Sequence, residues 1–210
     1  MLDGEPGQLD GAGDVLHVSG LVWRHGHRQA LAAVPDALLA RPVFSACAAA
    51  ALYRRHDWAR AGGFDERFFC YAEDVDLGFR LQLAGRACWY VADAVVHHVG
   101  SASAGVGSQF AIYHGHRNIE WMFVKNTPGP LFWRYLPLHL ATWVGGLAWF
   151  ARRGRARAFL QAKWDALRGM GPALRARRTS PPPGTATVAK LRRLLNHDPL
   201  RARFGARISA

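Results

Sequence analysis

Two adjacent carboxylates, Glu73 and Asp74, stand at the expected start of a helix, where they could serve acid–base chemistry. They follow a glycine turn at Gly62-Gly63 and a run of aromatic residues that would press the start of the helix against a core. A carboxylate fixed in this way at the edge of a cleft can act as a general base. Alternatively, the two acids only complement the helix dipole and cap backbone N–H groups. The residues alone leave both interpretations open.

A third carboxylate, Asp76, completes the letters D-x-D with Asp74, a pattern associated with metal-bound sugar nucleotides. We do not assign it that role. Such a site needs both carboxylates turned toward one ion, usually from a loop after a buried strand. Here Asp76 lies one turn into the expected helix, and Arg80 follows four residues later in the favourable order for an ion pair. We therefore expect Asp76 to pair with Arg80 only.

The elements that would position these residues follow from the apolar pattern. Over residues 73–83 apolar side chains recur with a period of 3.6, and Gly85 stands where a C-cap belongs, so we expect a helix there. Arg117-Asn118 would lie in a later helix, where an exposed ion pair is the default and a phosphate contact is an alternative that the spacing alone does not support. Residues 43–52 suit either a buried strand or a strand that enters a helix. The other expected elements are a short helix over 53–61, strands over 87–91 and 94–99, and a helix over 109–125.

Two stretches resemble a known family. The run GGFDERFFCYAEDVDLGFRLQLAGRACWYVADAVVHHVGSAS, which begins at Gly62, resembles the C-terminal half of family 2 glycosyltransferases, particularly the bacterial rhamnosyltransferase-like group. The later run YHGHRNIEWMFVKNTP is similar to the same family, and the resemblance covers about residues 43–128. It implies a GT-A fold, an α/β sandwich around a mixed sheet flanked by helices. It also implies transfer of a sugar from a nucleotide donor with inversion.

Residue by residue, the resemblance implies that Asp74 is the catalytic base and that Glu73 is its neighbour in the acceptor site. His98 matches the family histidine that can join a divalent metal ion, Mn or Mg. On the expected strand His97 and His98 would point to opposite faces, so that one of them can face a cleft. Inversion needs one base to take the acceptor proton, and a metal would neutralise charge on the departing diphosphate.

The family's N-terminal half, with its βαβ nucleotide-binding unit and metal-binding D-x-D, finds no match in this chain. The first residues, MLDGEPGQLDGAGD, are acidic and Gly-rich, with no signal peptide. We therefore interpret residues 1–127 as the acceptor-side half of a partial GT-A-like α/β fold. The implied partners are a nucleotide-sugar donor, bound through the missing half, and a glycan or lipid-linked acceptor.

Charge is distributed unevenly along the chain, whose formal net charge is +12. Residues 1–151 hold 12 Lys or Arg and 13 Asp or Glu, whereas residues 152–210 hold 15 and 2. A basic end beside a near-neutral body indicates contact with something anionic, phosphate or lipid. Regular aromatic–basic interleaving, zinc-finger spacing and a helix-turn-helix pattern are all missing, so we expect no nucleic-acid partner.

The segment between Arg134 and Arg152 contains 17 residues without a formal charge. This length is the short limit for a spanning helix, which leaves an interfacial segment, a core helix or a span open. Trp143 and Trp149 favour the interface, where anionic lipid would also attract the arginines that follow. Those arginines are Arg152, Arg153, Arg155 and Arg157.

The remaining expectations concern location and organisation. We expect residues 128–178 to form a helical, membrane-proximal extension and residues 179–210 a Pro-rich linker with a basic tail. The protein would be cytoplasmic, peripheral on the cytoplasmic face of an anionic membrane. The rival hypothesis is a non-catalytic, basic-tailed module that docks on that surface. Half of the chain is apolar and the three cysteines form no CxxC pair, which excludes disorder throughout and a disulfide scaffold.

Overall fold

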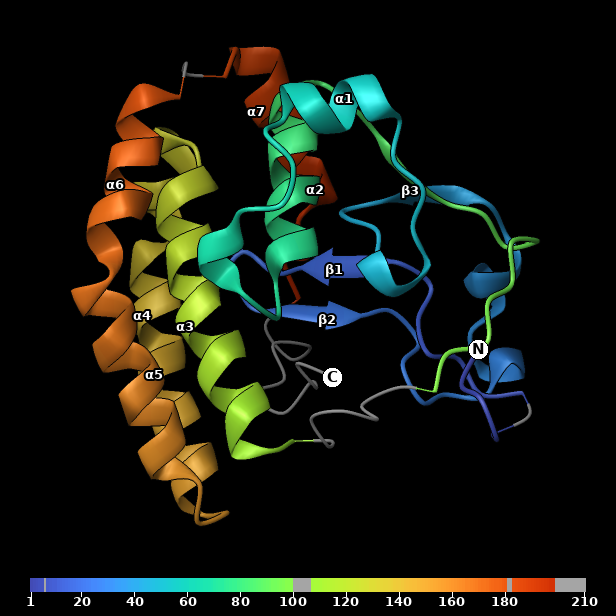
Figure 1. Ribbon diagram of the computed structural model, residues 1–210, viewed down its shortest axis with the longest axis horizontal. Coiled ribbons are helices and arrows are strands. Elements are labelled where there is room, and N and C mark those ends of the chain that lie inside the picture. Colours follow the sequence, from blue (N-terminus) through green and yellow to red (C-terminus); the bar gives the residue numbers. More distant parts are fainter. Residues whose placement is uncertain (6, 100–106, 181–182, 199–210) are drawn as a thin grey trace.

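The computed structural model describes residues 1–5, 7–99, 107–180 and 183–198 (Figure 1). Helices α3 to α6 form a layer on one side of the molecule, and the short strands lie on the other side. Helix α2 stands between the two parts, so its first turn faces both of them. This first turn carries Glu73 and Asp74.

In the described part of the chain, four short strands form two antiparallel ladders. A bridge between Asp14 and Ser45 joins them, so that the start of one ladder lies beside the end of the other. The first ladder pairs β1 (Asp14–Leu16) with β2 (Val22–Arg24), and the second pairs β3 (Arg41–Val43) with β4 (Cys88–Tyr90). The described residues contain no larger sheet, and the GT-A arrangement implied by the resemblance stays a prediction.

Three of the expected helices are confirmed, including the one that begins at Glu73. Gly85 follows it with a φ of +77°, a conformation in which only glycine is free of a Cβ penalty. Four short 3₁₀ turns occupy Leu31–Ala33, Pro35–Leu38, Ala48–Ala50 and Glu66–Phe68. The helices are α1 (Arg55–Arg60), α2 (Glu73–Leu83), α3 (Gln109–Asn126), α4 (Gly129–Ala151), α5 (Ala156–Arg168), α6 (Met170–Thr179) and α7 (Thr185–Leu194).

The expected strand over 94–99 is wrong, and over 43–52 the structure favours a strand that enters a helix over a buried strand. The apolar run 43–52 leaves the ladder after Val43 and turns into 3₁₀ helix, and its Leu52 side chain is fully exposed. The run 94–99 makes only an isolated bridge between His98 and Leu2, and its valines are exposed. Among the described residues, neither the first run after Ser45 nor the second run lies in a ladder with another strand. A strand without a partner leaves its backbone groups unpaired.

The main core joins segments that are far apart in the sequence. Val75 and Phe79 of α2 pack in one cluster with Leu16 of β1, Met122 of α3 and Leu191 of α7. Residues 185–194, expected as part of a basic tail, therefore form a helix whose apolar side closes the core. The domain boundaries at 127 and 178 stay predictions, because α3 packs closely against α5 and α6 across the first of them.

Helix α2 also approaches β3 very closely. A Cβ atom added at Gly78 would lie 2.3 Å from Cβ of Ser45, so only glycine permits this contact. Of the helices in the described ranges, none is both long enough and apolar enough to cross a membrane. The three cysteines are free, and Cys88 alone among them is fully buried.

Candidate functional site

The loop before α2 has an unusual backbone. Phe69, Tyr71 and Ala72 adopt φ angles of +61°, +69° and +64°, in the left-handed region that residues with a Cβ atom avoid. Each such residue costs roughly 1–2 kcal/mol, and strained positions of this kind cluster at functional sites. The strain reverses the chain directly before Glu73 and Asp74, so the surrounding structure must hold the loop in place.

Asn118 of α3 holds this loop. Its side chain is fully buried, and its Nδ2 donates to the carbonyl oxygens of Phe68, Cys70 and Tyr71 at 2.9, 2.8 and 2.7 Å. The neighbouring Arg117 also donates to the Phe68 carbonyl, at 3.1 Å. The expected exposed ion pair at this position is wrong, because both side chains serve backbone carbonyls of a loop about 50 residues earlier in the chain.

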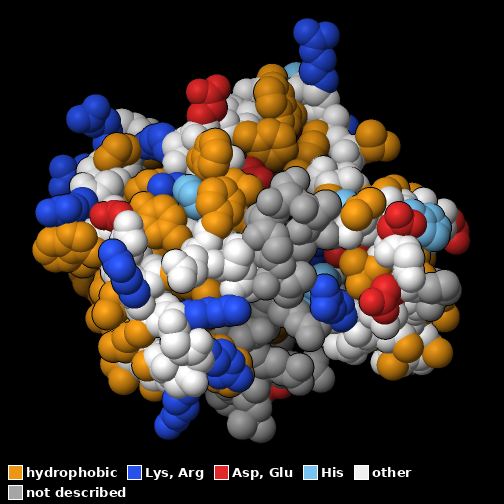
Figure 2. Space-filling model, turned by 60° about the horizontal axis from the view of Figure 1, so that its bottom comes forward, with side chains coloured by type: hydrophobic (Ala, Val, Ile, Leu, Met, Phe, Trp, Pro, Cys, Tyr) orange, Lys and Arg blue, Asp and Glu red, His pale blue; other side chains and the backbone are white. Residues whose placement is uncertain are grey.

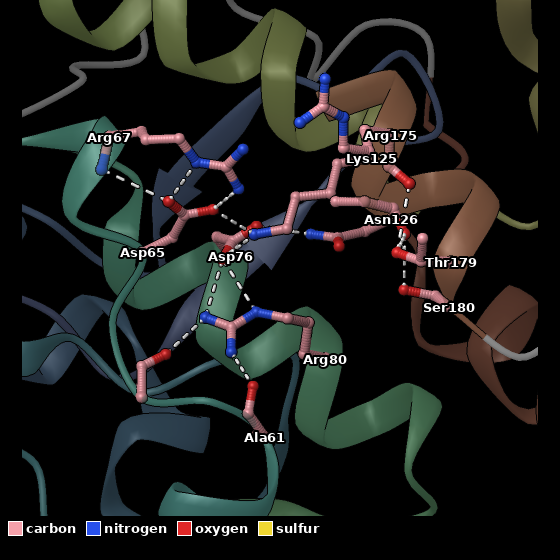
Figure 3. Close-up of polar contacts among 12 residues, drawn as sticks. Ala61, Asp65, Arg67, Asp76, Arg80, Lys125, Asn126, Arg175, Thr179 and Ser180 are labelled. Carbon is pink, nitrogen blue, oxygen red and sulfur yellow. Dashed lines mark hydrogen bonds and ion pairs between the residues drawn. The ribbon is translucent and has the colours of Figure 1, made fainter. Parts of the chain in front are cut away.

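The first turn of α2 is fixed by Asp76, whose carboxylate is completely buried (Figure 3). Arg80 donates through Nε at 2.9 Å, which confirms the expected pair. Lys125 and Asn126 of α3 donate as well, at 2.9 and 2.7 Å, so Asp76 does not pair with Arg80 alone. Lys125 also reaches Asp65 at 2.6 Å. This network ties the strained loop, α2 and α3 together.

The Arg80 guanidinium extends the network to the glycine turn. It donates to the Gly63 carbonyl at 2.7 Å and to the Ala61 carbonyl (Figure 3). Both carbonyls follow α1, so one side chain holds the end of α1 against α2. Asp76 and Arg80 are therefore positioning residues.

Glu73 and Asp74, both half-buried, differ in their surroundings. The Asp74 carboxylate accepts the backbone N–H groups of Ala48 at 2.9 Å and of Val75 at 2.8 Å, which orient it. One carboxylate oxygen of Glu73 is buried without a hydrogen-bond partner among the described residues. Burial, together with the neighbouring Asp74 charge, raises the pKa of Glu73 to about 7. Two adjacent acids in unlike environments can take different protonation states and thus different roles.

A third carboxylate, Asp14, lies at the start of β1 and was missed in the sequence. It is buried and accepts a hydrogen bond from the Ser45 hydroxyl at 2.8 Å. Burial and the Asp74 charge raise its pKa to about 7, against the opposing effect of Ser45. The Gly-rich sequence before Asp14 predicts only a loop, so no sequence signal indicates that Asp14 is a site residue. The structure thus places three carboxylates near one another, from β1 and from α2.

A hollow of about 790 Å³ opens beside this group, between β3–β4 and the N-terminal segment. Its lining includes Arg24, Tyr53 and Trp89, which offer a cation, a hydroxyl and an indole. Neither Glu73 nor Asp74 lines it. Asp74 borders it instead, because its bond to the Ala48 N–H lies between two lining residues, Cys47 and Ala49.

His98 lies at the hollow but is engaged by another partner. Its Nδ1 is 3.0 Å from an oxygen of Asp10, and Arg24 donates to both oxygens of the same carboxylate, at 3.0 and 2.9 Å. Burial would raise the pKa of Asp10, but His27, Arg24 and His98 outweigh it and hold it well below its usual range. A carboxylate neutralised by a guanidinium is a poor metal ligand.

Within the described ranges, no group of three or more His, Cys, Asp or Glu side chains is arranged to hold a metal ion. The residues around His98 thus do not fit the divalent ion that the resemblance implies, and the expectation of Mn or Mg stays a prediction.

A cluster of aromatic rings covers the surface next to the strained loop. Phe69 and Phe110 have ring centroids 6.4 Å apart, His114 lies 4.4 Å from Phe110, and Tyr71 lies 6.2 Å from Phe110. The Phe69 and Phe110 side chains are exposed although they are apolar. Such rings offer flat apolar surface, on which the C–H faces of a sugar can pack. This surface joins the loop that leads into Glu73.

The residues expected near a membrane lie at the far ends of α4 and α5. Arg152, Arg153, Arg155 and Arg157 are exposed around the turn between these helices. Trp149 is half-buried beneath the Arg153 guanidinium, 3.4 Å from its ring centroid. Trp143 differs from the expectation of a surface residue, because its indole nitrogen is buried and its ring lies 5.2 Å from the Lys163 ammonium.

One stretch of this chain is similar to a known glycosyltransferase. Over 76 residues it is 45% identical to N-acetylglucosaminyl-diphospho-decaprenol L-rhamnosyltransferase of Mycobacterium tuberculosis, in the strains CDC 1551 / Oshkosh and ATCC 25618 / H37Rv. The match covers 35% of this chain and 25% of each relative, so the chain spans about a quarter of the relatives' length. No family model matches, and neither does any solved structure. Membership of family 2 stays a prediction.

Proposed function

We propose that this chain supplies the acceptor-binding, base-bearing part of an inverting glycosyltransferase. The observation that carries the proposal is the stretch 45% identical to a rhamnosyltransferase. The geometry supports it, because an oriented carboxylate, Asp74, and a neutral-leaning one, Glu73, follow a strained and clamped loop. The substrates would be a nucleotide-activated sugar and a polyprenyl-diphosphate-linked amino sugar, as the relative's name suggests.

In the proposed step, Asp74 takes the proton of an acceptor hydroxyl as that oxygen attacks the anomeric carbon of the donor. The new bond forms between the acceptor oxygen and this carbon, and the bond to the nucleotide diphosphate breaks with its electron pair on the leaving oxygen. Attack from the face opposite the leaving group inverts the anomeric centre. Because the residues around His98 do not form a metal site, the step is written with this chain's own residues.

Glu73 and the aromatic rings would place the acceptor. With a pKa raised to about 7, Glu73 is protonated over much of the range below neutrality and can donate a hydrogen bond to a sugar hydroxyl. The rings of Phe69 and Phe110 would carry the apolar face of the same sugar. The acceptor would then approach Asp74 across the exposed end of the loop.

A turnover assay tests the proposal on the protein expressed from its complete reading frame. Labelled UDP-, GDP- and dTDP-linked sugars, including a rhamnose donor, are supplied with a short-chain lipid-diphosphate amino sugar, and labelled lipid product is measured. We expect Asp74→Asn to lower turnover by about 10²–10⁴-fold, the usual contribution of a general base. Glu73→Gln should mainly raise the KM for the acceptor.

The matched control is Asp93→Asn, which makes the same change at an exposed position. It should leave turnover unchanged. If Asp74→Asn keeps full activity while Asp93→Asn does the same, Asp74 is not the base. If the wild-type protein transfers none of the sugars, the catalytic proposal itself is wrong.

A further inference from the structure

Helix α4 turns its polar side inward and its apolar side outward. Its polar residues Tyr135, His139 and Thr142 are buried. Trp133 and Val144, by contrast, are 71% and 74% exposed, although they are large and apolar. Between Arg134 and Arg152 every exposed side chain of the helix is apolar. These residues are Pro137, Leu138, Leu140, Ala141, Val144, Ala148 and Ala151.

The buried polar side of α4 is satisfied by a network inside the helical layer. His139 lies 2.7 Å from the Glu120 carboxylate through Nε2 and 2.7 Å from the Ser19 carbonyl oxygen through Nδ1. Lys163 of α5 is also buried and bonds to Glu120. Burial alone would raise the pKa of Glu120, but Lys163 and His139 outweigh it and lower the value to about 2. His139 of α4 and Lys163 of α5 thus point away from the surface.

Helix α5 has an outward apolar face too. Leu160, Trp164 and Leu167, spaced four and three residues apart, share one side of the helix and are about half exposed. The two helices pack directly, with Gly146 of α4 against the ring of Phe159. We call the outward faces of α4 and α5 together the α4–α5 face.

Positive charge lies at the turn between the two helices and at the end of α5. Arg152, Arg153, Arg155 and Arg157 are exposed at its turn, and the Arg168 guanidinium lies 4.8 Å from the centre of the Trp164 ring. Between Glu120 and Asp198 the sequence contains one acid, Asp165, which accepts a hydrogen bond from Tyr113 at 2.9 Å. Figure 2 shows hydrophobic side chains interspersed with Lys and Arg on the helical side of the molecule.

We propose that the α4–α5 face binds the interface of an anionic lipid bilayer, with the helices parallel to the surface. The apolar side chains would enter the boundary between headgroups and acyl chains, and the arginines would contact anionic headgroups. A soluble protein partner would not require the surrounding charge to have a single sign, whereas an anionic bilayer favours it. The inference does not depend on the proposed sugar transfer.

Vesicle sedimentation tests the proposal with wild-type protein and vesicles of phosphatidylcholine, with or without phosphatidylglycerol. We expect wild type to bind the anionic vesicles and to bind less as salt rises, because the charge contacts are screened. Trp164→Gln with Leu160→Gln, and separately Trp133→Gln with Val144→Gln, should each weaken binding about tenfold or more, since apolar burial drives insertion. Replacing the four turn arginines by Gln should remove the salt dependence.

The matched control is Trp89→Gln with Leu39→Gln. These side chains are 59% and 64% exposed, close to Trp164 at 56% and Leu160 at 50%, but they belong to the region of β3 and β4, across the molecule in Figure 1. The control should bind vesicles as wild type does, and circular dichroism should show that every variant is folded.

Absence of wild-type binding to anionic vesicles would overturn the proposal, as would equal loss in the control. Light scattering without vesicles tests the alternative that a second copy of the chain binds the α4–α5 face. A wild-type dimer that both α4–α5 variants dissociate would also overturn it. Turnover on a water-soluble acceptor, measured in parallel, should not change in the two α4–α5 variants. Failure of the membrane proposal is therefore distinct from failure of the proposed catalysis.

Discussion

Asp14 is a buried acid whose ionisation should weaken the fold, and Asp14→Asn tests this directly. In the folded state burial and the Asp74 charge raise its pKa to about 7, from an ordinary value of 3.8. The unfolded chain releases this proton near pH 4, whereas the folded chain keeps it until about pH 7. Between these values the unfolded state binds fewer protons, so the free energy of unfolding falls as pH rises.

The size of the effect follows from the shift of about three pH units. At 1.36 kcal/mol per unit, wild type should lose about 4 kcal/mol of unfolding free energy between about pH 4 and pH 7, with no further loss above that. Asparagine cannot ionise, and its side-chain oxygen can still accept the Ser45 hydroxyl hydrogen bond. The variant should therefore lack this loss. Ionisation of Glu73 also lowers the free energy of unfolding as pH rises. It does so in both wild type and Asp14→Asn, so this contribution cancels in their difference.

Urea unfolding followed by tryptophan fluorescence, repeated at several pH values between about 5 and 8, measures this difference. Asp14→Asn should gain stability relative to wild type as pH rises, and most of the gain should appear below pH 7. The exposed-site control Asp93→Asn should run parallel to wild type. Parallel profiles for Asp14→Asn and wild type would refute the assignment of a protonated, buried Asp14.

Asp76→Asn should lower the free energy of unfolding by about 3–5 kcal/mol, because it removes one partner from a buried network and leaves Lys125 and Arg80 short of charge; a loss below about 1 kcal/mol in urea unfolding would contradict this. Asp76 is thus unsuitable as a neutral control for Asp74. Phe110→Ala should raise the KM for the acceptor several-fold, by roughly the 0.5–1.5 kcal/mol of an aromatic contact, with kcat and stability unchanged. An unchanged KM would show that the aromatic cluster is not the acceptor surface.

The sequence predicted those parts of the fold in which local signals are sufficient. Helix α2 shows a regular apolar period, an acid–base pair four residues apart and a glycine at its end, and each of these signals acts within a few residues. Strands over 43–52 and 94–99 were predicted on apolar content alone. Whether such a run becomes a strand depends on a partner elsewhere in the chain, which a local pattern does not contain.

The candidate site shows the same division. Glu73 and Asp74 could be chosen from their place before a helix and from the resemblance. Asn118 and Asp14 could not, because Asn118 acts on carbonyls 47 to 50 residues away and Asp14 on a serine 31 residues away. Asn118 also lies in a helix for which the sequence predicted only surface contacts. The sequence also did not predict that α4 buries polar residues and exposes apolar ones, because its composition is simply apolar.

The place of α7 has a consequence for how the chain acquires its structure. Leu191 and Leu195 pack in the same cluster as Leu16, and the His17–Asn196 bridge joins this end of the chain to the segment after β1. Strand β1 therefore completes its packing only with a helix that comes much later in the chain. During translation the apolar side of β1 stays exposed to solvent until residue 196 has emerged. This core therefore cannot complete its packing before α7 has been synthesised, although the helices that precede α7 could form earlier.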